Sequence, residues 1–210
     1  MQGFAAALFL CLFSTLLTAN QQTSAQQGSA QHAHQSPVAP AMKAGGFDQT
    51  LSLQGISFHV TSANAGSVNR LRIVPKGLKG DNKPIEKEID GTVTGAEVAD
   101  LNADGSPEVY VYATSAGSGS YGSLVAYAAN KGQSLSEIHL PSLQDDAKAA
   151  KGYRGHDEFR IVENSLVRRF PVYRDKDTNA QPTGGTRQIQ YKLKAGEAGW
   201  VLKPARTDNF

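Results

Sequence analysis

Short runs of alternating apolar and polar residues occupy much of the chain from Phe47 onwards. Successive side chains of a β-strand point to opposite faces, so alternation with a period of two predicts a strand with one face buried. The runs that show this pattern most clearly are 56–60, 71–73 and 189–193, and a closing strand is expected at 200–203; a strand is also expected at 124–128, which is apolar on both faces.

The segment 108–114 (EVYVYAT) is more apolar than its neighbours. Val109 and Val111 fall on one face of the expected strand, and Tyr110 and Tyr112 fall on the other. A strand that is apolar on both faces is typical of the interior of a fold. The sequence therefore predicts a central strand here.

Residues that favour turns separate these runs. Gly, Asn, Asp and Pro cluster at 64–66, 79–82, 130–132 and 183–185. Many short strands with frequent turn signals and no repeat of fixed period are typical of a sandwich or barrel rather than of a propeller. We predict an all-β fold, an antiparallel β-sandwich with one or two short helices.

One helix is expected at 143–151. Ser142 can cap it, acidic Asp145 and Asp146 fall in its first turn, and Gly152 can end it. This order of acids first and lysines last suits the helix dipole.

The N-terminal part of the chain has a different composition. Residues 1–19 carry an apolar run from Phe4 to Leu17, which has the length of a signal-peptide core and is too short to span a membrane. Residues 20–46 are rich in Gln, Ala and Ser and predict a disordered tether, in which His32 and His34 are solvated. The expected division is thus 1–19 signal peptide, with cleavage after Ala19 or Ala25, 20–46 tether, 47–204 domain and 205–210 tail.

Composition narrows the classes of function. The chain has 21 Lys and Arg against 19 Asp and Glu, and this balance argues against a protein held to nucleic acid by phosphate contacts. The only cysteine, Cys11, lies in the signal peptide, so the mature chain would have no disulfide and no thiolate site. We expect an exported, periplasmic protein with no membrane attachment after the signal is removed.

The most unusual local feature is a Gly- and Ser-rich loop at 115–122 (SAGSGSYG), placed between two expected strands. Its glycines keep the loop thin and allow backbone conformations closed to other residues. Ser118, Ser120 and Tyr121 can present hydroxyl groups at its tip, and Tyr is a stiff anchor for a binding surface. From composition alone, an ordinary hairpin connection remains the alternative.

Within this loop Ser118-Gly119-Ser120-Tyr121 matches a Ser-Gly-any-Tyr motif, and on it the chain resembles the periplasmic inhibitors of invertebrate-type lysozyme. The resemblance runs from about Phe47 to Lys203. It implies a β-sandwich that binds lysozyme, with Ser118, Gly119, Ser120 and Tyr121 at the contact and Ser118 and Tyr121 touching the enzyme. It also implies that the protein is not an enzyme, has no catalytic residues and needs no cofactor.

A second loop offers oxygen ligands at alternate positions: Asp100, Asn102, Asp104 and Glu108, with Gly105 at the sixth position. This pattern resembles the start of a calcium loop, but the twelfth position is Val111, which excludes an EF-hand. A turn rich in Asp and Asn is the other interpretation. Calcium is therefore a weak candidate here, and the alternative function is a calcium-dependent extracellular adhesion or glycan-binding module.

Three further motifs have ordinary structural interpretations. The cluster 155–158 (GHDE) is expected to be a polar turn rather than a hydrolase centre built on His156 and Asp157. The segment 183–187 (TGGTR) predicts a tight turn, with an anion cradle or a second partner-contacting loop as alternatives. Arg168 and Arg169 are expected on an exposed strand edge or face.

Overall fold

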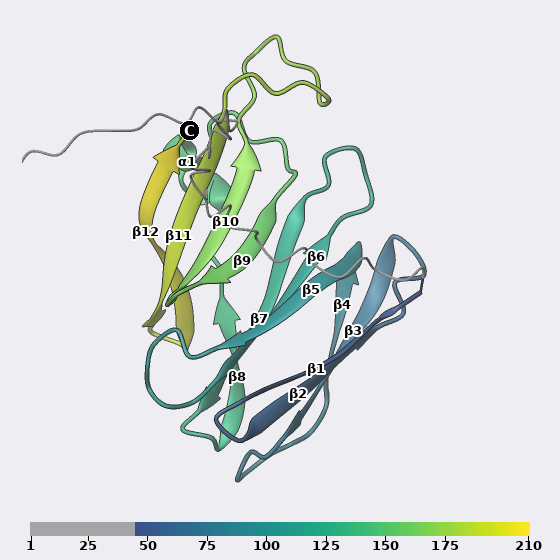
Figure 1. Cartoon of the computed structure of the whole chain (residues 1–210), viewed down its shortest axis with the longest axis vertical. Helices are drawn as coiled ribbons and strands as arrows, with labels where there is room; N and C mark the ends of the chain where they lie inside the picture. The colour runs from purple at the N-terminus through teal and green to yellow at the C-terminus, as the bar shows by residue number, and fades with distance from the viewer. Residues whose placement is uncertain (1–44) are drawn as a thin grey trace, which may run out of the picture. The chain divides into compact units, whose positions relative to one another are not determined.

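The computed structural model describes residues 45–210, which fold into strands β1–β12 with one short helical region (Figure 1). The predicted signal peptide, almost all of the tether, Cys11, His32 and His34 lie outside these residues. Within the described part of the chain, no helix is long and apolar enough to cross a membrane. The predicted all-β, sandwich-like fold is confirmed.

The first sheet is an antiparallel meander in the order β1-β2-β3-β4. Its strands are β1 Phe47–Leu53, β2 Ile56–Ser62, β3 Val68–Lys76 and β4 Ile85–Asp90. Alternation is strict in β2, where Ile56, Phe58, Val60 and Ser62 are buried and the residues between them are not. One face of this sheet therefore packs inward and the other faces solvent.

The second sheet has eight strands in the order β5-β6-β7-β8-β12-β11-β10-β9. Its strands are β5 Thr92–Ala99, β6 Glu108–Thr114, β7 Gly122–Asn130, β8 Ser134–His139, β9 Glu158–Val162, β10 Ser165–Pro171, β11 Thr186–Ala195 and β12 Trp200–Asn209. Neighbouring strands are antiparallel except β8 and β12, which run parallel and pair through Trp200 with Ile138 and Val201 with His139.

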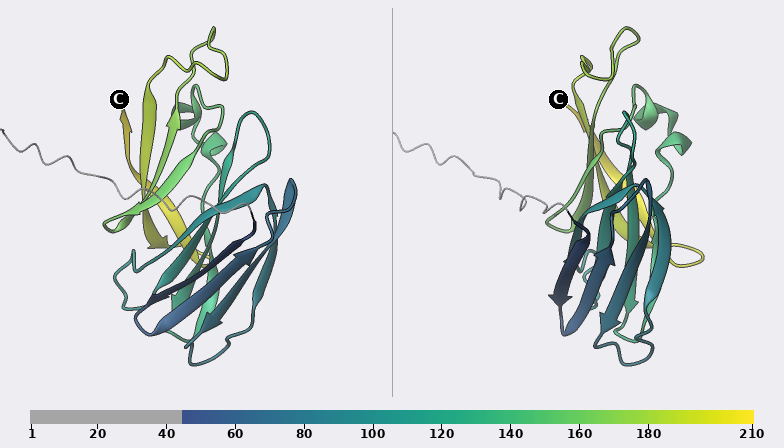
Figure 2. Two further views of the ribbon diagram at one scale, coloured as in Figure 1. Left: turned by 45° about the vertical axis from the view of Figure 1, so that its right-hand side comes forward. Right: turned by 90° about the vertical axis from the view of Figure 1, so that its right-hand side faces the viewer.

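Two hydrophobic cores lie on opposite faces of β6. Val109 and Val111 belong to the core formed with the first sheet, whereas Tyr110 and Tyr112 belong to the core formed with β10, β11 and β12. The second sheet thus folds over itself to enclose its own core (Figure 2). The prediction that 108–114 is a central strand, covered on both faces, is confirmed.

The curvature of the second sheet brings its two edge strands, β5 and β9, close together. The carboxylate of Glu97 on β5 accepts a hydrogen bond from the backbone N–H of Ile161 on β9 at 2.8 Å. The same oxygen accepts the hydroxyl of Tyr112 at 2.5 Å. Glu97 therefore joins two edges that would otherwise present unpaired backbone groups.

The predicted helix at 143–151 is interrupted. A 3-10 turn, Leu143–Asp145, and an α-helix, Ala147–Ala150, are separated by Asp146, whose backbone is extended. Asp146 interrupts the helix because its side chain accepts the N–H groups of Lys148 and Ala149, which makes it the cap of a new helix. The expected cap at Ser142 is present and serves only the first turn.

The C-terminal residues also depart from expectation. The tail predicted at 205–210 continues β12, since Thr207 pairs with Ile189 and Asn209 with Arg187. A bulge between Gln190 and Tyr191 accommodates Pro204, which cannot donate a backbone hydrogen bond.

Candidate functional site

The Gly- and Ser-rich loop connects β6 to β7 and is pinched at its base. The backbone N–H of Ser115 donates to the carbonyl of Tyr121 at 2.9 Å, and the N–H of Tyr121 donates to the Ser115 hydroxyl at 3.0 Å. These two bonds close the loop between residues 115 and 121. The tip consequently projects as a narrow, defined turn.

The loop exposes two of the four motif residues, one at its tip and one at its base. Ser118 is exposed, and 51% of Tyr121 is exposed, an unusual value for a large aromatic side chain. A Cβ atom on Gly119 would lie 2.5 Å from the Tyr121 ring, so only glycine allows that ring to lie over the loop backbone. Ser120 instead turns inward, and its hydroxyl donates to the carbonyl of Gly117 at 3.3 Å.

A second segment holds the loop from outside. The N–H of His156 donates to the carbonyl of Gly119 at 2.7 Å. Gly155, with φ of +94°, makes this approach possible, because a Cβ there would lie 1.9 Å from the Gly119 carbonyl oxygen. The glycine-containing turn at 155–156 is therefore a support for the loop.

A buried carboxylate, Asp157, lies beneath both segments. It accepts the N–H of Gly122 at 2.8 Å, the hydroxyl of Tyr153 at 2.6 Å and Nε of Arg168 at 2.7 Å. The Asp157 side chain is fully buried and that of Arg168 is 7% exposed. Gly122 is the first residue after the loop, so this ion pair fixes the position at which the chain leaves it.

These contacts correct two expectations. Arg168 was expected on an exposed edge or face, but it is buried because it neutralises Asp157, while Arg169 is exposed. The 155–158 cluster is more than a polar turn, since Asp157 is a structural anchor. Asp157 accepts hydrogen bonds from Gly122, Tyr153 and Arg168, and within the described residues none joins it to His156.

Aromatic rings link this anchor to the loop tip. Tyr153 packs edge-on against Tyr121, with ring centroids 5.7 Å apart, and against Phe170 at 4.8 Å. The guanidinium of Arg168 lies over the Tyr153 ring at 5.1 Å from its centroid. Burial and the hydrogen bond to Asp157 raise the pKa of Tyr153, so its hydroxyl remains a donor at neutral pH.

No pattern in the sequence indicates this support. Tyr153 and Asp157 lie in the connection between α1 and β9, and Arg168 lies on β10, so their contacts depend on how β9 and β10 pair. The sequence placed the loop itself between two strands, and β6 and β7 confirm that position.

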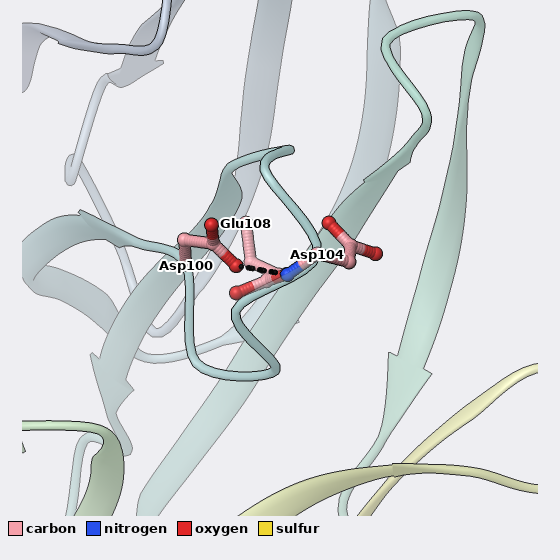
Figure 3. Close-up of side chains that lie close together, drawn as sticks. All are labelled: Asp100, Asp104 and Glu108. Atoms are coloured by element: carbon pink, nitrogen blue, oxygen red, sulfur yellow. Dashed lines mark hydrogen bonds between the residues drawn. The ribbon is translucent and has the colours of Figure 1, made fainter.

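The Asp100–Glu108 loop brings its carboxylates together (Figure 3). One oxygen from each of Asp100, Asp104 and Glu108 lies within 4.8 Å of the others. Backbone N–H groups already occupy several acceptor positions: Asp104 and Gly105 donate to Asp100, and Leu101 donates to Glu108 at 2.7 Å. The loop has the hydrogen bonding of an Asx-rich turn, and its donor set also suits a hard cation such as calcium.

The segment at 183–187 forms one side of the base of a long loop and the start of β11, since Thr186 and Arg187 lie in that strand. Gly184 donates to the carbonyl of Val172 at 2.8 Å, and Val172 donates to that of Gly185 at 2.8 Å. A Cβ on Gly184 would lie 2.5 Å from the Val172 carbonyl oxygen, which explains the glycine. The predicted tight turn is therefore wrong, because these residues pair with Val172 across the loop base and form no turn among themselves.

Comparison with known proteins gives one match. Residues 85–154 match the family described as periplasmic lysozyme inhibitor of I-type lysozyme. The match covers β4 to the short helix, including the whole β6–β7 loop, and is narrower than the span from Phe47 to Lys203 expected from the resemblance. No curated protein and no solved structure matches the chain.

The family description agrees with two expectations from the sequence. It confirms the predicted periplasmic location. It also supports an inhibitory rather than an enzymatic role. The family resemblance seen in the Ser118–Tyr121 motif is thereby confirmed over residues 85–154, which match the family of periplasmic inhibitors of I-type lysozyme.

Proposed function

We propose that this protein inhibits an I-type lysozyme by inserting the loop 115–121 into the active-site cleft. The single observation that carries the proposal is the exposed tip of a loop that is fixed on both sides. Ser118 is exposed at this tip and the side chain of Tyr121 is exposed at the base of the loop, and both lie within the span that matches the inhibitor family.

The chemistry of the target suits this tip. A lysozyme cleft carries two carboxyl groups, one protonated and one ionised. The hydroxyls of Ser118 and Tyr121 are donors that can bond to these groups, and each bond to a charged acceptor contributes about 1.5–3 kcal/mol in a favourable setting. The inhibitor itself needs no reacting group, because occupation of the sugar site is sufficient.

Rigidity of the loop supports tight binding. Association costs free energy for every side chain and loop that must be ordered. Here the base of the loop is closed by Ser115 and Tyr121, and its flank is held by His156. Because the loop backbone is already ordered in the free protein, binding should cost little further free energy for ordering it.

The first experiment is a cell-wall lysis assay with the purified chain, titrated against invertebrate-type, chicken-type and goose-type lysozymes. We expect stoichiometric inhibition of the invertebrate type. The double variant Ser118→Ala/Tyr121→Ala should weaken inhibition by about 100-fold or more, because two anchoring contacts are lost.

The matched control is Ser52→Ala/Phe210→Ala, which removes an exposed serine and an exposed aromatic ring elsewhere on the surface. This control should inhibit like the natural chain, and both doubles should keep its unfolding temperature. Full inhibition by Ser118→Ala/Tyr121→Ala would defeat the assignment of the loop. Absence of inhibition of all three lysozymes would favour the calcium-dependent adhesion or glycan-binding function of the Asp100–Glu108 loop.

A further inference from the structure

The connection between β10 and β11 is a second projecting loop. It spans residues 172–185, whereas a β-hairpin needs only about 2–5 residues. Its base is closed by the two hydrogen bonds between Val172 and residues 184–185, so residues 174–183 project beyond the strands. Figures 1 and 2 show it at the same end of the sheet as the β6–β7 loop.

This loop has no regular structure but is braced from within. The carboxylate of Asp177 accepts the N–H of Arg174 at 2.7 Å, the N–H of Thr183 at 2.8 Å and the hydroxyl of Thr183 at 2.8 Å. The backbone hydrogen bonds from Arg174 and Thr183 lower the pKa of Asp177, so the carboxylate stays ionised at neutral pH. One side chain therefore ties the two arms of the loop together.

The loop is also tied to the first loop and to its support. Arg154 donates to the carbonyl of Asp177 at 2.8 Å and lies over the ring of Tyr173 at 5.0 Å. At the tip, the amide of Asn179 donates to the hydroxyl of Ser118 at 3.4 Å. The two loops thus form one continuous surface around Ser118.

Charged residues of both signs alternate along this second loop, with Arg174 and Lys176 interleaved with Asp175 and Asp177. Arg174 and Lys176 are exposed and, among the described residues, neither side chain has an acidic partner within ion-pair distance. Long loops that are ordered and polar at their surface are commonly used for binding. A pair of available cations beside a loop that enters a carboxylate-bearing cleft complements the chemistry of that cleft.

We propose that residues 174–183 form a second contact with the lysozyme, in which Arg174 and Lys176 meet acidic groups at the rim of the cleft and Asp177 holds the loop in its binding shape. This inference rests on the proposed function, since it names a second contact with the same partner. The interface with lysozyme would then consist of the β6–β7 loop and the β10–β11 loop, which meet where Asn179 contacts Ser118.

The test measures dissociation rates of the inhibitor–lysozyme complex. Arg174→Ala/Lys176→Ala should speed dissociation by about tenfold and flatten the dependence of affinity on salt, because rim charges contribute salt-sensitive attraction. Asp177→Ala should speed dissociation to a similar extent because it loosens the loop, but it should not flatten the salt dependence, because the cations remain and only a negative charge is lost.

The charge-matched control is Lys194→Ala/Lys203→Ala, two exposed lysines toward the opposite end of β11 from the loop. It should leave the dissociation rate unchanged, and all variants should keep the unfolding temperature of the natural chain. If the natural chain inhibits and both loop variants dissociate at its rate, the second contact is wrong while the proposed function stands. If the natural chain does not bind lysozyme, the proposed function itself fails.

Discussion

Two buried carboxylates in this protein are treated differently. Asp157 forms an ion pair with Arg168. Burial alone would lower the pKa of Arg168, but the Asp157 carboxylate outweighs burial, so the pKa of Arg168 is raised. Glu108 is 1% exposed and has Asp100 and Asp104 as its acidic neighbours. Burial and these like charges raise the pKa of Glu108 to about 7. Ionisation of Glu108 above this pH therefore lowers the stability of the folded state.

The cost of Glu108 should appear in the pH dependence of stability. The folded state holds the proton more tightly than the unfolded state, so stability should be greatest near pH 4.5 and fall as pH rises to 7 and above, by about 3 kcal/mol in all. Glu108→Gln keeps an acceptor for Leu101 and should remove this fall, which makes the variant the more stable protein at pH 8. Urea unfolding between pH 5 and 8, with a chelator present, measures the effect.

An exposed carboxylate gives the control, since Glu88→Gln should leave the pH profile of the natural chain unchanged. Parallel profiles for the natural chain and Glu108→Gln would contradict the assignment. Repeating the pH 8 measurement with calcium tests the metal: a gain in stability for the natural chain that Glu108→Gln lacks would establish a site at Asp100, Asp104 and Glu108.

At the scale of elements, alternation predicted the strands whose inner faces are strongly apolar, such as β2 and β11. It did not predict β4 (IEKEID), β5 or β8 (SLSEIH), because each of these strands has few buried residues among its polar and partly exposed ones. These strands are fixed by pairing with neighbours rather than by their own composition. The loop 115–122 was found because it is local in sequence, whereas its support at 153–157 depends on tertiary contacts.

The element that supports the loop can be tested at one glycine. Gly155→Ala places a methyl group 1.9 Å from the Gly119 carbonyl oxygen and demands a positive φ of an alanine. The 155–156 turn must then move away, so inhibition of lysozyme should fall by tenfold or more, and unfolding should cost about 1–3 kcal/mol less.

Gly105→Ala is the matched control, because Gly105 also has a positive φ, of +81°, but nothing lies within 4 Å of its added Cβ. It should lose stability through backbone strain alone and inhibit normally. Equal loss of inhibition in both variants would mean that general destabilisation, rather than loop position, explains the effect.

At the scale of the molecule, β6 joins the two cores. Val111 on one face and Tyr110 on the other belong to the same seven-residue strand, so loss of either core should expose the other. A domain built in this way is expected to unfold in one step.

Ile73→Ala tests this coupling from the far side of the first core. Ile73 is fully buried, and its truncation should lower stability by about 2–5 kcal/mol. Trp200, the only tryptophan of the chain, packs on the second core and reports on it by fluorescence. We expect fluorescence and far-ultraviolet circular dichroism to shift together to lower urea, and a fluorescence midpoint that stays in place would show that the cores unfold separately.

The parallel pairing of β8 with β12 has a consequence for the order of folding. Strands β1 to β8 each pair with a sequence neighbour, so they can assemble before the remaining strands are in place. The strands that cover Tyr110 and Tyr112 come last, and β12 must reach back to β8 across all of them. Closing such a long loop is slow, on the order of milliseconds to seconds for β-rich domains. During that interval one apolar face of the second sheet is open to solvent, and the partly folded chain is most exposed to aggregation and proteolysis.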